Sequence, residues 1–150
     1  MTLREALLND LAAKGLRNTE TPPDRLYEDD WFRVNFRHRS IKLFRLKGMI
    51  ESVAIHDAHH LLTGYGIDLR GESEIAAWEL ASGGCGRHWL MWLDRSVTLI
   101  TVAVFHPRAS WAAARRGWRE RNLYRADFEG VLRLDLEAVR AGLSRRDEAW

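Results

Sequence analysis

The stretch from His56 to Glu72 constrains the fold of this chain more than any other feature of its sequence. His56 and His60 are four residues apart, so on a helix their rings project from one face, about 6 Å apart along the axis. Gly64 and Gly66 then break the helical pattern, and Glu72 follows them. A second helix after this turn would return Glu72 to the two histidines. The sequence therefore predicts two consecutive helices that bring these three side chains to one point.

This combination of side chains suits a metal ion. Neutral imidazoles with carboxylates are ligands for zinc, and also for iron(II) or manganese. Asp57 borders the face of the two histidines, in the HDxxH position that a catalytic glutamate holds in HExxH zinc proteases. Because aspartate is one methylene shorter than glutamate, we interpret Asp57 as a ligand and not as a base. A polar helix face with exposed histidines and an unrelated metallohydrolase are the alternatives.

The rest of the chain is predicted to be helical. Thr2 and Glu5 form a capping box before a short amphipathic helix that extends to Gly15. Glycines, prolines and capping residues predict further helices over residues 49–63, 72–83 and 87–105, one that starts at Ser110 and a last one that starts at Asp135.

Residues 31–46 give a mixed signal. Phe32, Val34 and Phe36 alternate as in a strand, whereas Ile41, Phe44 and their neighbours suit a helix, and we predict a helix here. With 150 residues, the chain has the length of one domain with a sizeable core. We therefore predict an all-α fold, a single-domain irregular helical bundle with the metal site on a central helix.

The most apolar predicted helix covers residues 87–105. It carries apolar side chains on several faces, which is typical of a buried core helix. The alternative is that it forms one wall of a hydrophobic groove for an isoprenoid tail. Asp94 and Arg95 interrupt its apolar character, which argues against a membrane span and suits an internal ion pair or the mouth of a pocket.

Composition limits the compartment and the partners. The single cysteine, Cys85, excludes an internal disulfide. The sequence contains no run of about 18 apolar residues, so we expect no membrane span. We expect a cytoplasmic protein, in peripheral contact with the inner face of the membrane at most. Basic and aromatic residues alternate over residues 32–47, which suits a solvated face or an anionic membrane surface. We expect no nucleic-acid partner, because no recognition motif accompanies this interval.

One known family shares these motifs. HDxxH, eleven further residues and a glutamate, together with LLTGYG and the C-terminal stretch NLYRADFEGVLRLDLEAVRAGL, resemble the coenzyme Q biosynthesis protein 4 family. The resemblance covers residues 27–143, so that residues 1–26 form an N-terminal helix and loop and residues 144–150 a tail. It implies four metal ligands, which are His56, Asp57, His60 and Glu72.

The resemblance also implies a function. Members of the family act in ubiquinone biosynthesis at C1 of a prenylated aromatic precursor, where the carboxyl group is removed and oxygen is installed. We therefore expect a metal-dependent, oxidative-decarboxylase-like enzyme. A non-catalytic prenyl-lipid-binding or scaffold protein of a quinone-biosynthesis complex is the alternative. The implied partners are a prenylated aromatic or isoprenoid lipid, other quinone-biosynthesis proteins and a second copy of the chain. The chain departs from the family in its reduced N-terminal region and in the Gly83-Gly84-Cys85-Gly86 interruption.

Two further residues are candidates for a catalytic role. His59 is next to the ligands but about 100° around the helix, so it is either a proton shuttle or a residue that supports a ligand. Glu79 lies two turns beyond Glu72. It is either an acid/base group, a hydrogen-bond partner of a ligand or a solvated glutamate. Asp68 is a substitute ligand or an ordinary turn residue.

Overall fold

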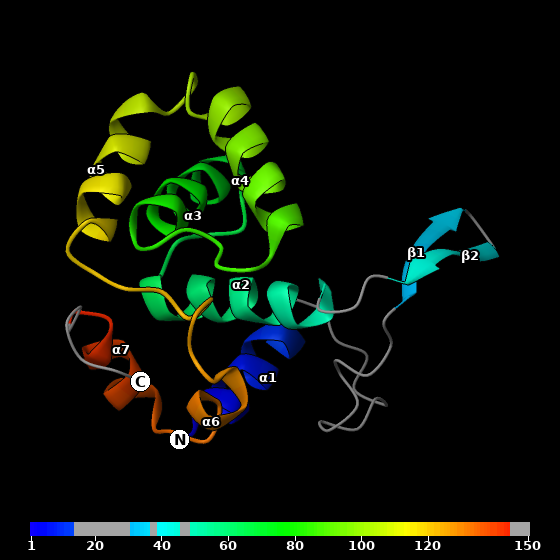
Figure 1. Cartoon of the computed structure of the whole chain (residues 1–150), viewed down its shortest axis with the longest axis horizontal. Helices are drawn as coiled ribbons and strands as arrows, with labels where there is room; N and C mark the ends of the chain where they lie inside the picture. Colours follow the sequence, from blue (N-terminus) through cyan, green and yellow to red (C-terminus); the bar gives the residue numbers. More distant parts are fainter. Residues whose placement is uncertain (14–30, 37–38, 46–48, 145–150) are drawn as a thin grey trace.

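The computed structural model describes residues 1–13, 31–36, 39–45 and 49–144 (Figure 1). Within these ranges the chain forms seven helices and one antiparallel hairpin, and the predicted all-α, single-domain fold is confirmed. The elements are α1 (Leu3–Ala13), β1 (Trp31–Phe36), β2 (Arg39–Arg45), α2 (Met49–Thr63), α3 (Leu69–Ala81), α4 (Trp89–Val102), α5 (Pro107–Gly117), α6 (Phe128–Val131) and α7 (Leu136–Gly142).

α2 lies in the middle of the helical domain. Figure 1 shows α3, α4 and α5 on one side of it and α1, α6 and α7 on the other. α3 contacts α4 and α5, whereas α1 and α7 contact both α2 and each other. The helix that carries HDxxH is therefore central, as predicted. α2 and the segments around it supply the largest fully buried apolar side chains, which include Trp78, Leu3, Leu7, Ile55, Leu62, Ile75, Leu123 and Val139.

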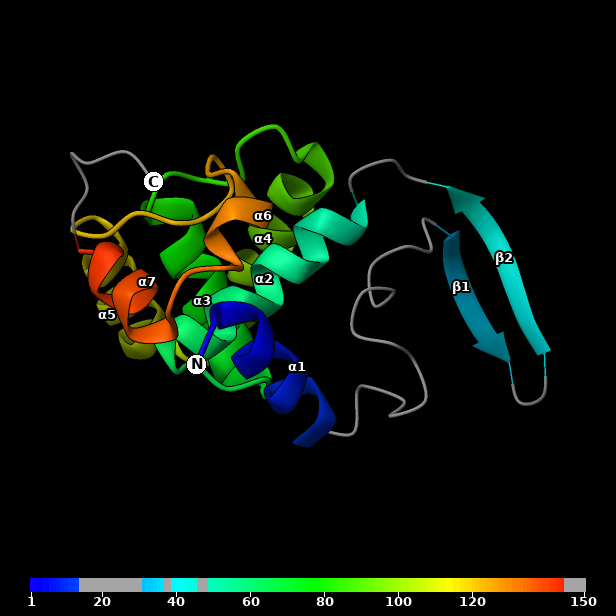
Figure 2. The same cartoon turned by 90° about the horizontal axis from the view of Figure 1, so that it is seen from below.

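The prediction of a helix over residues 31–46 is wrong. β1 and β2 pair antiparallel, with Trp31 opposite Arg45 and Phe36 opposite Arg39. Phe32, Val34 and Phe36 alternate as strand residues do, and pairing within the hairpin satisfies the backbone groups that face the other strand. In both views the hairpin stands apart from the helical domain (Figures 1 and 2).

α1 begins as the capping box predicts. The Thr2 amide donates to the Glu5 carboxylate at 2.9 Å, and the Glu5 amide donates to the Thr2 hydroxyl at 3.3 Å. The predicted loop after this helix lies outside the described residues, and so does the tail beyond residue 144. Because α1 packs against α2 and α7, the N-terminal helix belongs to the core of the domain.

The turn between α2 and α3 depends on its glycines. Gly64 adopts a φ of +79°, a left-handed conformation in which side chains are strained. A Cβ atom at Gly71 would collide with the carbonyl group of Gly66, so the turn closes tightly onto the start of α3. Asp68 caps this helix by accepting a 2.8 Å hydrogen bond from the Gly71 amide. α3 therefore begins at Leu69, three residues earlier than expected, and Asp68 has a structural role.

The interpretation of residues 87–105 as a buried core helix is wrong. In α4, whose residues are all described, Met91 is the one apolar side chain that is buried. The other buried side chain of this helix is the charged Arg95. Trp89, Leu93 and Ile100 are 66%, 58% and 73% exposed. Periodicity alone could not reveal this, because α4 packs against α3 through a narrow stripe and leaves its remaining apolar faces open. α5 also begins earlier than expected, at Pro107, because proline fits the first turn of a helix.

Candidate metal centre

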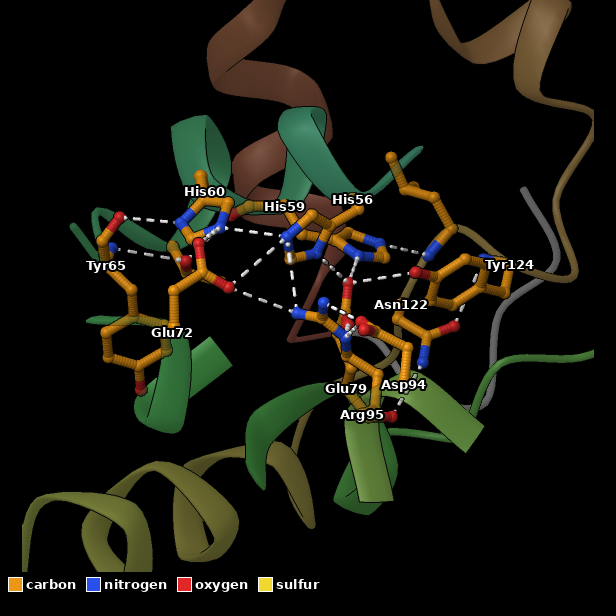
Figure 3. Close-up of polar contacts among 12 residues, drawn as sticks. His56, His59, His60, Tyr65, Glu72, Glu79, Asp94, Arg95, Asn122 and Tyr124 are labelled. Carbon is orange, nitrogen blue, oxygen red and sulfur yellow. Dashed lines mark hydrogen bonds and ion pairs between the residues drawn. The ribbon is translucent and has the colours of Figure 1, made fainter. Parts of the chain in front are cut away.

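Side chains from four separate segments meet at the inner side of α2 (Figure 3). α2 contributes the three histidines of HDAHH, and α3 contributes Glu72 and Glu79 one above the other. α4 contributes Arg95, and the segment after α5 contributes Asn122 and Tyr124. The helical spacing and the glycine turn thus bring together His56, His60 and Glu72, three of the four predicted ligands.

His56, His60 and Glu72 form the part of this cluster that could hold a metal ion. One ligand atom from each lies within 4.8 Å of the others. The Nε2 atoms of the two histidines are 3.1 Å apart, and Glu72 Oε1 lies 3.3 Å from His60 Nε2. Glu72 Oε2 lies 3.8 Å from His56 Nε2. The Glu72 side chain is 30% exposed, so the group opens to solvent on its side.

Hydrogen bonds orient both imidazoles toward this point. His60 Nδ1 lies 3.0 Å from the carbonyl oxygen of Tyr65, and His56 Nδ1 lies 3.0 Å from Glu79 Oε1. Because both partners only accept, each Nδ1 carries the proton and donates it. In the neutral ring the Nε2 atom is then unprotonated and has a free lone pair, which is the form in which imidazole binds a metal.

The geometry fits a metal with nitrogen and oxygen ligands. Two nitrogens at about 2.05 Å from a tetrahedral zinc ion are about 3.3 Å apart, close to the separation of the two Nε2 atoms. Two Nε2 atoms that face each other at 3.1 Å cannot both carry a proton. Such a pair either shares one proton or binds a cation, and Glu72 adds negative charge beside it.

The local charges favour a protonated His60 beside an ionised Glu72 when no metal is bound. Burial by itself would lower the pKa of His60, but hydrogen bonds to Glu72 and to the Tyr65 carbonyl outweigh burial and raise it. Burial would raise the pKa of Glu72, and the hydrogen bond and charge of His60 instead lower it. A metal ion would take the place of this shared proton.

The carboxylate of Glu79 is the shared hydrogen-bond acceptor behind the His56, His60 and Glu72 group. It is fully buried, and its Oε1 accepts hydrogen bonds from His56 Nδ1 at 3.0 Å, His59 Nδ1 at 2.6 Å and the Tyr124 hydroxyl at 3.1 Å. Burial by itself would raise the pKa of Glu79, but the hydrogen bonds from His56 and His59 hold it well below its usual range. Glu79 Oε2 has no hydrogen-bond partner among the described residues, and Arg95 Nε is 3.8 Å away.

His59 is held as a neutral ring by its surroundings. The backbone amide of Leu123 donates to His59 Nε2 at 3.0 Å, so the proton of the ring is on Nδ1 and points to Glu79. Complete burial lowers the pKa of His59 and outweighs the opposing effect of Glu79. Since neither His59 nor Glu79 is exposed, their position suits residues that orient ligands better than groups that touch a substrate.

The sequence matches no family model, and no curated protein and no solved structure is significantly similar to it. The resemblance to the coenzyme Q biosynthesis protein 4 family therefore depends on the motif residues alone and stays a prediction.

Asp57 does not belong to the group of converging ligand atoms. It lies on α2 beside His56 and is half-buried, and its assignment as a fourth ligand stays a prediction. Asp94 and Arg95 form an ion pair, but the pair is not internal, because the Asp94 side chain is 55% exposed. Cys85 is buried, and burial raises the pKa of its thiol to about 12, which suits a filler residue and not a nucleophile.

Sequence reasoning missed the polar groups of the segment after α5. Asn122 Nδ2 donates to the backbone carbonyls of Glu79 and Gly84, and Tyr124 donates to the Glu79 side chain. These residues come 43 and 45 positions after Glu79, in a segment without helical periodicity. An isolated Asn and Tyr in such a segment give no signal of a distant carboxylate.

An apolar groove lies between α3, α4 and α5. It has a volume of about 480 Å³ and is lined by Ala77, Leu80, Ala81, Leu99, Ala103, Pro107, Ser110, Trp111, Ala114 and Trp118. Leu99 is one helical turn beyond Arg95 on α4, so the groove begins close to the polar cluster along the chain. Among the helices of the described residues, none has both the length and the apolar character to cross a membrane.

Proposed function

We propose that this protein binds a divalent metal, zinc in the first place, and acts in the C1 oxidative decarboxylation and hydroxylation of a prenylated aromatic carboxylate. The observation that carries the proposal is the pair of Nε2 atoms of His56 and His60, 3.1 Å apart and next to the Glu72 carboxylate. Asp57 is the fourth ligand in this proposal, and iron(II) or manganese are the other candidate metals.

The residues around the group have distinct tasks in this proposal. A bound metal would supply Lewis-acid stabilisation of charge that develops on the ring oxygen of the substrate. Glu79 holds the His56 ring in the tautomer that leaves Nε2 bare, and the Tyr65 carbonyl does the same for His60. Overall, the bond between C1 and the carboxyl carbon breaks and carbon dioxide leaves, while a two-electron oxygen-atom donor from solution, such as a peroxide, supplies the oxygen of the new C1 hydroxyl group and is itself reduced to water.

The apolar groove supports a substrate with a hydrocarbon tail. The groove is lined mainly by apolar side chains and lies along α4 beyond the polar cluster. A ring at the metal group with an isoprenoid chain in the groove would match this division into a polar and an apolar part. The exposed apolar residues of α4 and α5 would suit peripheral contact with the membrane in which such a lipid resides.

Metal content tests the proposal directly. Protein purified without chelator should contain about one metal ion per chain, by native mass spectrometry and elemental analysis. His60→Ala should lose the metal, whereas His106→Ala, a histidine at the start of α5, should keep it. The proposal fails if the wild-type protein takes up none of zinc, iron(II) or manganese.

The exposed apolar surface favours one alternative, a non-catalytic lipid-binding or scaffold protein that retains the metal for folding. Trp111 and Trp118 are 57% and 51% exposed beside the groove, as a docking surface would require. The two functions are separated by expressing His60→Ala in a strain deficient in quinone synthesis. Complementation by a folded, metal-free variant would exclude catalysis at this centre and favour the scaffold.

A further inference from the structure

Arg95 is a buried cation next to the ligand atoms. Its side chain is 8% exposed, and its Nη1 atom lies 3.3 Å from both His56 Nε2 and Glu72 Oε2. On the other side, Arg95 Nε donates to Asp94 Oδ2 at 2.9 Å, and Arg95 Nη2 bonds the same oxygen. Figure 3 shows the guanidinium group between the histidines and Asp94.

The two sides of this guanidinium group differ in accessibility. Glu72 and Glu79 belong to the inner cluster, whereas the Asp94 side chain is 55% exposed. A carboxylate from a ligand can replace the exposed Asp94 carboxylate on this buried guanidinium group, because the exchange of one carboxylate for another keeps the buried charge paired. The planar fork of the guanidinium group then offers two parallel N–H donors toward the solvent side.

Metal binding would also free a donor of Arg95. His56 Nε2 cannot at once accept a hydrogen bond from Arg95 Nη1 and bind a metal with the same lone pair. With a metal on His56, the Nη1 atom would lose this partner and would keep its contact with Glu72. The site would then combine the metal ligands with an adjacent buried cation, Arg95, and an exchangeable carboxylate, Asp94.

We infer that Arg95 anchors the carboxylate group of a ligand that enters the metal centre, and that Asp94 occupies this anchor until the ligand displaces it. The inference rests on the proposed metal centre and names the residue that holds the carboxylate of the proposed substrate. Leu99, one turn further along α4, is the groove residue nearest to Arg95 on this helix.

Calorimetric titration of the zinc-loaded protein tests the inference, with 4-hydroxybenzoate as the probe and neutral 4-hydroxybenzyl alcohol as the matched control. The wild-type protein should bind the benzoate and prefer it to the alcohol. Because hydrogen bonds to a charged group contribute strongly, Arg95→Gln should weaken benzoate binding by about 10- to 100-fold and alcohol binding by much less. Asp94→Asn should bind the benzoate several-fold more tightly, since the internal competitor has lost its charge.

Two variants keep the test decisive if Arg95→Gln fails to fold. Arg95→Lys keeps the buried charge but loses the fork, and should weaken benzoate binding by less than Arg95→Gln. Asp94→Asn changes an exposed residue and should fold. The inference is overturned if the wild-type protein does not distinguish the two probes, or if benzoate binding is unchanged in both Arg95→Lys and Asp94→Asn.

The outcomes also separate this inference from the proposed function. If zinc binds and His60→Ala abolishes its binding, yet benzoate and alcohol bind equally, Arg95 is not an anchor and the metal centre stands. If no metal binds, but benzoate binds to the wild-type protein and not to Arg95→Gln, the proposed function fails and the anchor stands. A benzoate preference that persists in a folded Arg95→Gln would assign carboxylate binding to the metal alone.

Discussion

The Oε1 atom of Glu79 receives hydrogen bonds from three side chains of two segments, His56 and His59 on α2 and Tyr124 after α5. Glu79→Gln leaves an oxygen that can accept these bonds but removes the charge that strengthens them. Because such partners fix the ring of a ligand, we expect zinc affinity to fall about 10- to 100-fold. Competition with a chromophoric chelator measures this.

Glu74→Gln is the matched control for Glu79→Gln, since Glu74 is on the same helix and pairs with the exposed Arg70. It should leave zinc affinity unchanged. Equal affinities in both variants and the wild-type protein would show that Glu79 does not orient the ligand.

His59 gives the stability of the metal-free protein a dependence on pH. Complete burial lowers its pKa in the folded state below the ordinary histidine value of about 6.5. Between the folded and the unfolded pKa, the unfolded chain binds more protons, so the free energy of unfolding rises with pH in this window. The contribution of His59 is therefore complete above about pH 6.5 and is lost as the pH falls toward the folded pKa.

Urea unfolding of the chelator-treated protein at a series of pH values measures this effect. His59→Asn keeps an N–H donor for Glu79 but cannot titrate, so its stability should fall less steeply below about pH 6.5 than that of the wild-type protein. Identical slopes would assign the pH dependence to other groups.

The residues of the site differ in how far the sequence could predict them. His56, His60 and Glu72 were predictable because helical spacing and one glycine turn fix their relation locally. The position of Arg95 beside them was not, because it depends on how α4 packs against α3. Asn122 and Tyr124 were the least predictable of these residues. They lie in a loop, and a loop has no periodic sequence pattern from which their positions could be inferred.

At the scale of elements, the α2–α3 turn sets the position of Glu72. Gly71→Ala would place a methyl group against the Gly66 carbonyl, and we expect the free energy of unfolding to fall by about 1–3 kcal/mol. Zinc affinity should fall with it, because Glu72 is the next residue. Urea unfolding and zinc titration check both effects.

Leu69→Ala is the control for the turn, because this neighbouring side chain is 70% exposed. It should change stability by no more than about 0.5 kcal/mol. A Gly71→Ala variant as stable as Leu69→Ala would contradict the tight closure of the turn.

α4 offers a second test at this scale. Ile100 is 73% exposed and Leu62 of α2 is 2% exposed. Ile100→Ser should therefore change the free energy of unfolding by less than about 0.5 kcal/mol, whereas Leu62→Ala should lower it by about 2–5 kcal/mol. Chemical denaturation compares the two. A large loss in Ile100→Ser would mean that this face of α4 is buried.

The elements were predictable where local signals were strong. Capping residues and glycines located α1, α2 and α7 closely, because these signals act on the helix ends themselves. The β1–β2 hairpin and the exposure of α4 were misread for different reasons. The hairpin has a mixed pattern, and the burial of an apolar helix depends on neighbours that its own sequence does not encode.

At the scale of the whole molecule, the site joins the two layers of helices through α2. A ligand that binds this site in the folded state alone stabilises the entire domain. At a zinc concentration of about 100 times the Kd, we expect about 2.7 kcal/mol of added stability. For a domain of this size, the Tm should then rise by roughly 5–10 °C.

Thermal unfolding with zinc and after chelation measures this coupling. His60→Ala should show no zinc-dependent rise in Tm. A rise of the same size in His60→Ala would place the zinc elsewhere on the protein.

The all-α architecture and single domain were predictable, because length, composition and helical periodicity act over the whole chain. The arrangement in two layers around α2 was not, since helices with apolar residues on several faces are compatible with many packings.

The hydrogen bond from the Leu123 amide to His59 Nε2 makes one backbone position a reporter for the buried cluster. Exchange of this amide hydrogen for deuterium requires that the segment after α5 separates from α2. The rate at Leu123 therefore records how often the histidines lose their support, even when no reaction is followed. Its nitrogen resonance should also shift when the His59 ring takes up a proton, so a single peak in an NMR spectrum follows both the opening of the protein and its protonation.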